Sequence, residues 1–241
     1  MKKESEMRTT VIVTGAASGI GQAVCMALLH MGQYFVVGID KDPISLSGAV
    51  DSFCTIEGDL IEDDLHVLRL LHTTLLECPR VSGLVNAAGI SDRDFDKSMA
   101  LNVKAPMALF DYVIDNRFNK DGDKHEWFSV VNVGSPEGTV GANKPEYSAS
   151  KAAVHGLSMA WARGYGEVGV RANTILPGAC ITGMTSDWSV EKRHAVAQGT
   201  FRKFMHQPKE IADVIAFLIS DQSSAISGSQ IDCTFGGMFR A

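Results

Sequence analysis

The chain has 241 residues, of which 45% are hydrophobic and 21% are charged, and its net charge at pH 7 is −6. This length and composition predict a single α/β domain over residues 1–241, with a flexible start at residues 1–8. The acidic balance argues against a general nucleic-acid binder. The first apolar run, residues 11–13, is far too short for a signal peptide or a membrane span, so we expect a cytoplasmic protein without a membrane partner.

A strand, a glycine turn and a helix are predicted at the start of the chain. β-branched residues at 9–14 indicate the strand, and the helical pattern over 22–31 stops at a glycine. Between them the chain reads Gly15-Ala16-Ala17-Ser18-Gly19-Ile20-Gly21. Glycines here let the backbone turn tightly and approach a pyrophosphate, whose charge meets the free amides at the helix N-terminus. The spacing departs from the general Gly-x-Gly-x-x-Gly dinucleotide fingerprint.

The second predicted strand, residues 34–39, is followed directly by Asp40, nineteen residues after Gly21. An acid at this place accepts hydrogen bonds from an adenosine ribose and repels a 2′-phosphate, which favours NAD over NADP. Two other interpretations stay open: Asp40 could simply begin a turn that continues to Pro43, and the cation of Lys41 could take a 2′-phosphate.

Strands and helices alternate along the rest of the chain. The pattern predicts a Rossmann-like, doubly wound parallel sheet of about seven strands, flanked by helices and joined by right-handed crossovers. The link from Asp40 to the third strand is short for a full helix, and residues 179–204 read as a loop and a flexible helix over a pocket. The remaining strands are expected at 53–56, 83–89, 130–133, 170–176 and 229–233, and the remaining helices at 63–78, 100–118, 147–165 and 208–220.

An acid/base pair is indicated by Tyr147 and Lys151, which stand four residues apart on a predicted helix and so share one face. A nearby cation favours the phenolate, so the hydroxyl can exchange a proton closer to neutral pH. Ser135 follows a predicted strand, at the carboxyl end where open α/β sheets bind ligands. Hydroxyls of Ser135 and Tyr147 aimed at one carbonyl oxygen would stabilise the charge that grows there during reduction.

Together these elements resemble the short-chain dehydrogenase/reductase family, in its single-domain branch. The resemblance covers nearly the whole chain and rests on motifs that occur in a fixed order. They are Thr14-Gly15-x-x-x-Gly19-x-Gly21, Asp59-Leu60, Asn86-Ala87-Ala88-Gly89, Asn102, Ser135, Tyr147-x-x-x-Lys151, and Pro177-Gly178 with Thr182.

The resemblance implies an NAD(H)-dependent oxidoreductase that transfers hydride between nicotinamide and a secondary alcohol or ketone. Tyr147 would be the acid/base, Lys151 would lower its pKa and bind the nicotinamide ribose, Ser135 would bind the substrate oxygen, and Asn102 would hold a water linked to Lys151. A homotetramer or dimer is also implied. The cofactor-binding residues would be Gly15, Ser18, Gly19, Ile20, Gly21, Asp40, Asp59, Leu60, Asn86, Ala87, Ala88, Gly89, Tyr147, Lys151, Pro177, Gly178 and Thr182.

Two features depart from the family pattern. Gly89 and Asn102 are only thirteen residues apart, so the helix that normally begins between them is expected to be trimmed. Glu137 places an acid beside Ser135, where it could repel acidic substrates, meet a polar one, or be an exposed loop carboxylate. We expect substrate contacts from residues 91–95, 136–142 and 180–194, with Met184 and Trp188 as apolar walls.

Two other functions stay open: an NADP-dependent carbonyl reductase, and a nucleotide-binding regulator with little turnover. No metal site is predicted, because the cysteines show neither a Cys-x-x-Cys motif nor a histidine at ligand spacing. The five cysteines are Cys25, Cys54, Cys78, Cys180 and Cys233.

Overall fold

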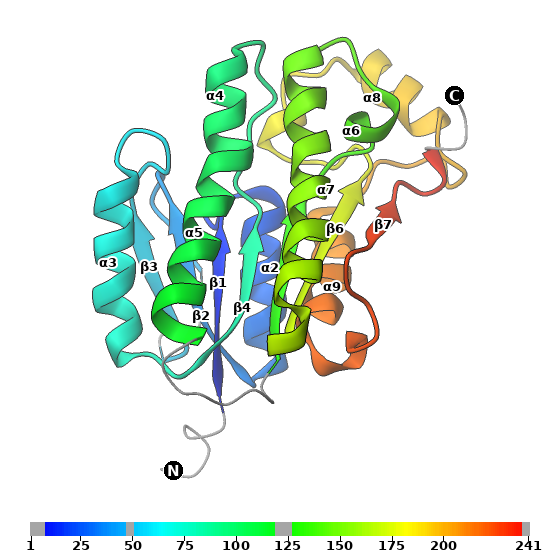
Figure 1. Cartoon of the computed structure of the whole chain (residues 1–241). Coiled ribbons are helices and arrows are strands. Elements are labelled where there is room, and N and C mark those ends of the chain that lie inside the picture. Colours follow the sequence, from blue (N-terminus) through cyan, green and yellow to red (C-terminus); the bar gives the residue numbers. More distant parts are fainter. Residues whose placement is uncertain (1–7, 47–50, 119–126, 238–241) are drawn as a thin grey trace.

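The computed structural model describes residues 8–46, 51–118 and 127–237. Seven parallel strands form one sheet in the order β3-β2-β1-β4-β5-β6-β7, which confirms the predicted Rossmann-like α/β fold (Figure 1). The predicted flexible start at 1–8 lies outside the described residues, apart from Arg8. The strands are β1 (Thr9–Thr14), β2 (Tyr34–Asp40), β3 (Phe53–Glu57), β4 (Val81–Asn86), β5 (Phe128–Val133), β6 (Val170–Pro177) and β7 (Gln230–Cys233).

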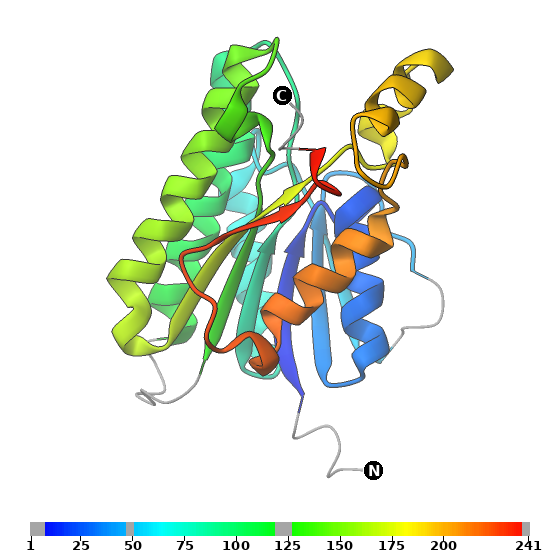
Figure 2. The ribbon, with the colours of Figure 1, turned by 90° about the vertical axis from the view of Figure 1, so that its right-hand side faces the viewer.

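Helices cover both faces of the sheet (Figure 2). One layer is formed by α2 and α9, and the other by α3, α5 and α7. Since both faces are covered, the central strands are almost continuously buried. The helices are α2 (Gly19–Met31), α3 (Asp64–Glu77), α4 (Phe95–Met99), α5 (Ala105–Val113), α6 (Glu137–Val140), α7 (Pro145–Tyr165), α8 (Val190–Gln198) and α9 (Pro208–Ile219).

Two hydrophobic cores, one on each face, hold these layers together. On the α2 and α9 face, Val24 and Ile215 are fully buried against the sheet. On the opposite face, the ring of Phe110 from α5 stacks on that of Trp161 from α7, with centroids 4.2 Å apart. This stacking fixes the axial position of α7, which carries the tyrosine and lysine predicted to act as the acid/base pair.

The helix predicted over 100–118 begins earlier than expected. Helical structure starts at Phe95, where the Asp94 carboxylate accepts a hydrogen bond from the amide of Lys97 at 3.0 Å, and it runs through a π-helical turn (Ala100–Lys104) into α5. A second π-helical turn (Ile114–Phe118) follows α5. The trimmed segment therefore keeps a capped first turn.

The other predicted elements are found within a few residues of their expected ends. No helix forms among residues 41–46, in agreement with the short link before β3. The stretch after β6 contains a 3-10 turn (Gly183–Thr185) and α8, as expected for a loop followed by a helix. None of the helices in the described part of the chain is both long and apolar enough to cross a membrane.

Candidate active site

The residues singled out in the sequence gather at the carboxyl edge of the sheet, where the strand arrows end in Figure 1. Gly15, Asp40 and Ser135 follow or end strands β1, β2 and β5 respectively, while Tyr147 comes from the first turns of α7. The carboxyl edge of a doubly wound sheet is where such folds bind their ligands. The fold alone therefore brings residues more than 100 positions apart to one edge.

The glycine turn is tightly packed between β1, β4 and α2. Gly15 adopts a left-handed conformation with φ of 70°, and a Cβ on it would lie 2.8 Å from the amide nitrogen of Ala88. A Cβ on Gly21 would collide with the carbonyl oxygen of Gly15. Both positions therefore require glycine.

The N-terminus of α2 has the features of an anion site. Ser18 is the N-cap residue but its side chain makes no capping hydrogen bond, and no acidic residue occupies the first turn. The first amides of this 13-residue helix are consequently left to meet a negatively charged group. Their position beside the glycine turn is compatible with the predicted pyrophosphate site.

Asp40 is held against the glycine turn. Its Oδ2 accepts a hydrogen bond from the amide of Ala17 at 2.9 Å, and its Oδ1 accepts one from the amide of Asp42 at 3.0 Å. The carboxylate thus begins a turn, as one interpretation had it, and it also stands beside the turn that would hold the dinucleotide. The neighbouring Lys41 is exposed.

Ser135, Tyr147 and Lys151 are buried together at the end of β5. Their exposed fractions are 8%, 8% and 6%. The ammonium of Lys151 donates to the carbonyl oxygen of Val133 at 2.7 Å and lies 5.8 Å from the centroid of the Tyr147 ring. The phenol and the ammonium therefore share one face of α7, as their spacing predicted.

Burial controls the protonation of this pair. It raises the pKa of Tyr147 to about 12, although the hydrogen bond with Ser135 works in the other direction, and the charge of Glu137 adds to the rise. Burial also lowers the pKa of Lys151 to about 8. The expectation that Lys151 brings the phenol pKa closer to neutrality is not met in this structure, because removal of the hydroxyl from water dominates.

Asn102 forms hydrogen bonds that connect its own helical turn with the loop after β4 and with α7. Its amide nitrogen donates to the Ile90 carbonyl oxygen at 3.0 Å and to Ser150 Oγ at 2.9 Å, and its Oδ1 accepts from the Ile90 amide at 2.9 Å. Gly89 lies between Asn102 and Lys151: a Cβ there would be 3.1 Å from Asn102 Oδ1 and 3.2 Å from Lys151 Nζ. Asn102 is thus placed next to the lysine but is engaged with protein atoms.

Replacing Asn102 by alanine should destabilise the fold as well as the site. The substitution leaves the partly buried amide and carbonyl groups of Ile90 without these partners, at roughly 1–3 kcal/mol each, and removes one of the two hydrogen bonds of the Ser150 hydroxyl, which still donates to the Tyr147 carbonyl oxygen. Urea denaturation followed by circular dichroism measures the loss. Asn116→Ala, which removes a single bond to Tyr112 within a helix, is the control and should cost under about 1 kcal/mol. Equal losses in the two variants would contradict the role given to Asn102.

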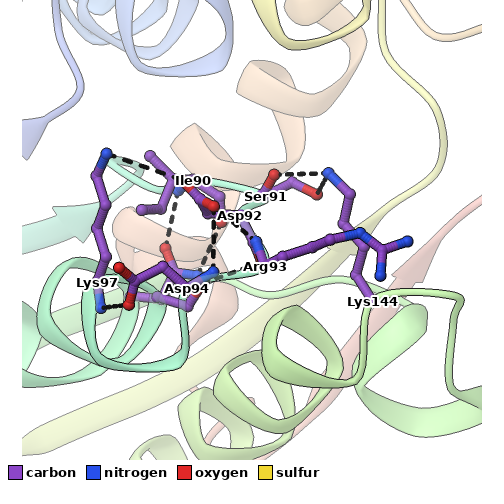
Figure 3. A network of polar contacts seen from close by, with 9 residues as sticks. Ile90, Ser91, Asp92, Arg93, Asp94, Lys97 and Lys144 are labelled. Atoms are coloured by element: carbon purple, nitrogen blue, oxygen red, sulfur yellow. Dashed lines mark hydrogen bonds and ion pairs between the residues drawn. The ribbon is translucent and has the colours of Figure 1, made fainter.

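A second polar network borders the site and was not predicted from the sequence. Lys144, directly before α7, donates to the Ser91 carbonyl oxygen at 2.7 Å and to Ser91 Oγ at 3.3 Å (Figure 3). Asp92 accepts hydrogen bonds from the amides of Arg93 and Asp94, at 2.7 and 3.2 Å. The network fastens the loop after β4 to the start of α7. No sequence signal pairs residues 53 positions apart.

Several residues of the family motifs make hydrogen bonds within the protein. Thr14 Oγ1 accepts from the amides of Ala87 and Ala88, at 3.1 and 3.0 Å, which joins the ends of β1 and β4. The side chain of Asn86 is buried and donates a hydrogen bond to Asn132 Oδ1, on the neighbouring strand β5, at 2.7 Å. Asp59 accepts from the amide of Ile61 at 2.7 Å.

The loop after β6 closes against the glycine turn. A Cβ on Gly19 would lie 3.2 Å from Cγ2 of Thr182. Thr182 itself begins the 3-10 turn and donates its amide to Thr185 Oγ1 at 3.2 Å. Pro177 ends β6, and Gly178 packs against His206. Of the predicted apolar walls, Met184 is half exposed and Trp188 is partly buried.

The described residues include no candidate metal site. Among residues 8–46, 51–118 and 127–237 there is no group of three or more His, Cys, Asp or Glu side chains that could hold a metal ion. Of the cysteines, Cys25 and Cys180 are buried, and burial raises the pKa of each thiol to about 12.

Comparison with known proteins agrees with this geometry. The profile of the short chain dehydrogenase family matches residues 9–193. The chain belongs to the short-chain dehydrogenase/reductase family. It is 32% identical to the short-chain dehydrogenase/reductase cdmF of Talaromyces verruculosus, and the match covers 92% of this chain and 93% of the relative.

Two solved structures of dehydrogenases show similar folds. A 4-hydroxyisoleucine dehydrogenase in complex with NADH is 27% identical, with a TM-score of 0.80 over 95% of this chain and 98% of that one. The aldohexose dehydrogenase of Thermoplasma acidophilum is 24% identical, with a TM-score of 0.85 over 98% of this chain and 97% of that one. As a short-chain dehydrogenase/reductase, the protein is an oxidoreductase that acts on an alcohol or a ketone with a nicotinamide cofactor.

Proposed function

We propose that the protein is an NAD(H)-dependent dehydrogenase that interconverts a secondary alcohol and its ketone. The observation that carries this proposal is the burial of Ser135, Tyr147 and Lys151 together at the same edge of the sheet as the N-terminus of α2, which lacks a side-chain cap. A proton-transfer group and an anion site then lie at one edge of the sheet. The bound dinucleotide supplies or accepts the hydride.

Each of the four predicted catalytic residues has a distinct part in this proposal. Ser135 and Tyr147 donate hydrogen bonds to the substrate oxygen, and Tyr147 gives it a proton during reduction or removes one during oxidation. Protonated Lys151 favours the phenolate of Tyr147 relative to a neutral amine at the same place. Asn102 holds Ile90 and Ser150, and through them the position of α7 relative to the loop after β4.

We propose that the dinucleotide is held by the residues that the family resemblance implies. The α2 amides would meet the pyrophosphate, Asp40 the adenosine ribose, Lys151 the nicotinamide ribose and Thr182 the carboxamide. Asp59 keeps its second carboxylate oxygen for a cofactor contact and Asn86 keeps its amide oxygen, since their hydrogen bonds engage Asp59 Oδ1 and Asn86 Nδ2. The other residues proposed to line the cofactor are Gly15, Ser18, Gly19, Ile20, Gly21, Leu60, Ala87, Ala88, Gly89, Tyr147, Pro177 and Gly178.

The position of Asp40 supports NAD over NADP. Its carboxylate is fixed by the amides of Ala17 and Asp42, so it cannot move away from a 2′-phosphate without breaking both bonds. The same oxygens can accept hydrogen bonds from ribose hydroxyls. The 4-hydroxyisoleucine dehydrogenase, which is similar in sequence and fold, binds NADH.

Fluorescence titration with NADH and NADPH tests the cofactor preference. We expect the wild type to bind NADH at least about tenfold more tightly, because NADPH places a phosphate against a carboxylate. Asp40→Asn keeps the shape of the side chain and the hydrogen bond from Ala17 but removes the charge. It should therefore reduce the preference for NADH over NADPH. Asp42→Asn, two residues away and exposed, should leave it unchanged. Tighter NADPH binding by the wild type would favour the carbonyl-reductase alternative, with Lys41 as the phosphate ligand.

The remaining expectations follow from family membership and from the sequence. The homotetramer or dimer, the cytoplasmic location and the single domain over 1–241 stay predictions.

A further inference from the structure

The acid beside the candidate catalytic serine is fixed in place by its own short helix. The amide of Glu137, the first residue of α6, donates to Ser135 Oγ at 3.2 Å. At the next position, a Cβ on Gly138 would lie 2.7 Å from the Ala152 amide nitrogen, so α6 packs directly on the backbone of α7. Because Gly138 allows this close approach, Glu137 is held near Tyr147.

The Glu137 carboxylate is half buried and has no hydrogen-bond or ion-pair partner among the residues that the structure describes. Burial raises its pKa, while the charges of Lys144 and Lys192 act to lower it. Its oxygens still reach water, but the carboxylate is partly dehydrated and no protein donor replaces the lost water. Such a group gains from a ligand that brings a donor.

The two nearby lysines are held by other partners. The Lys144 ammonium is bound to the carbonyl and hydroxyl oxygens of Ser91 (Figure 3). The Lys192 ammonium, on α8, lies over the ring of Trp188 at 4.0 Å from its centroid. On α7, Lys151 donates to Val133. All three cations therefore have contacts of their own, and the carboxylate of Glu137 is left without a direct counterion.

The charge of Glu137 also bears on the reaction. The Glu137 amide contacts Ser135 Oγ and the carboxylate charge raises the pKa of Tyr147, so it opposes negative charge at the reacting oxygen. A substrate with a hydrogen-bond donor next to the reacting carbon would satisfy the carboxylate, and a cationic donor would also offset its charge. A carboxylate on the substrate would be repelled.

We infer that Glu137 is a specificity-determining residue, which selects alcohols and ketones that carry a protonated amine, or less strongly a hydroxyl, on the carbon next to the reacting one. This inference rests on the proposed dehydrogenase function, because the selected group is placed relative to the carbon that exchanges hydride.

A matched series of small alcohols tests the selection. The compounds 1-amino-2-propanol, 1,2-propanediol, 2-butanol and 3-hydroxybutyrate differ at one substituent, which is an ammonium, hydroxyl, methyl or carboxylate group. With NAD and the wild type, kcat/KM should fall in that order, with at least about tenfold between ammonium and methyl, as expected for a charge-assisted hydrogen bond. Glu137→Gln should remove most of the ammonium advantage over hydroxyl and raise the relative rate for the carboxylate.

The control is Glu77→Gln, which removes an exposed carboxylate at the end of α3, outside the segments proposed to contact substrate or cofactor, and should leave the order unchanged. An unchanged order in Glu137→Gln, or faster oxidation of 3-hydroxybutyrate than of the amine by the wild type, would overturn the role of Glu137 and leave the dehydrogenase function standing. Turnover of other secondary alcohols without turnover of 1-amino-2-propanol would overturn it too. No oxidation of any alcohol in a broad panel by a folded protein that binds NADH would instead contradict the proposed function itself.

Discussion

Tyr147→Phe should lower kcat by about 10²- to 10⁴-fold, because that is the usual contribution of a positioned acid/base group. The phenyl ring retains the packing of the tyrosine, which is 8% exposed, and the variant loses only the hydroxyl. Binding of NADH should change by no more than a few fold. Steady-state rates at 340 nm, together with cofactor titration by fluorescence, measure the two effects separately.

The pH dependence of the wild type supplies a second test of this tyrosine. Reduction needs the protonated phenol, which is present below its pKa, whereas oxidation needs the phenolate. Since burial raises the pKa of Tyr147 to about 12, alcohol oxidation should rise with pH from 7 to 10. The rise should be less steep above about pH 8, where Lys151 loses the charge that favours the phenolate, while ketone reduction should be supported at neutral pH. The alkaline rise should be absent in Tyr147→Phe.

Tyr165→Phe is the matched control for Tyr147→Phe. Tyr165 ends the same helix and contacts Phe110 edge to face, with centroids 5.2 Å apart, far along the chain from the site. Its loss of a hydroxyl should leave kcat and the pH profile unchanged. Retention of more than a tenth of the wild-type kcat in Tyr147→Phe would contradict the role of Tyr147 as the acid/base.

Gly21→Ala should destabilise the protein by roughly 3 kcal/mol or more and abolish cofactor binding, since inserting even one methyl into a closed backbone contact forces the chain apart. The added Cβ would collide with the carbonyl oxygen of Gly15, and a main-chain atom cannot move out of the way as a flexible side chain could. Both the glycine turn and the first turn of α2 would have to shift. Thermal unfolding and NADH titration measure the two losses.

Gly156→Ala is the control for this substitution. Gly156 also lies in a helix, α7, but a Cβ there would meet nothing within 4 Å. Because alanine is the better helix former, this variant should gain up to about 1 kcal/mol and bind NADH as the wild type does. NADH binding by Gly21→Ala equal to that of the wild type would contradict the assignment of the glycine turn as the pyrophosphate site.

The fold was predictable because its signals are local. Short β-branched runs end at glycines, and Tyr147 and Lys151 share a helix face at any i, i+4 spacing. The start of helical structure at Phe95 was missed, because residues 95–99 are mostly polar and too few to show a helical period, so the aspartate cap before them was not recognised. The short helix α6 was missed as well, since four residues are too few to show a period.

Contacts between distant segments could not be read from the sequence. The bonds of Asn102 to Ile90 and Ser150, and those of Lys144 to Ser91, depend on where the sheet places the loop after β4. The raised pKa of Tyr147 was missed for the same reason: the spacing shows that a lysine is near, but the extent of burial depends on the packing of the whole site. Glu137 was recognised in the sequence, whereas its lack of a counterion required the structure.

Transfer of hydride is the central claim, and isotope transfer tests it most directly. Secondary alcohols deuterated at the carbinol carbon are incubated with NAD and the wild type, and the nicotinamide ring is then analysed by mass spectrometry. We predict that the wild type transfers deuterium to the nicotinamide ring. The rate of this transfer should be at least about a hundredfold lower in Tyr147→Phe. Tight cofactor binding without deuterium transfer from any alcohol in a broad panel would contradict the account and favour a nucleotide-binding regulator.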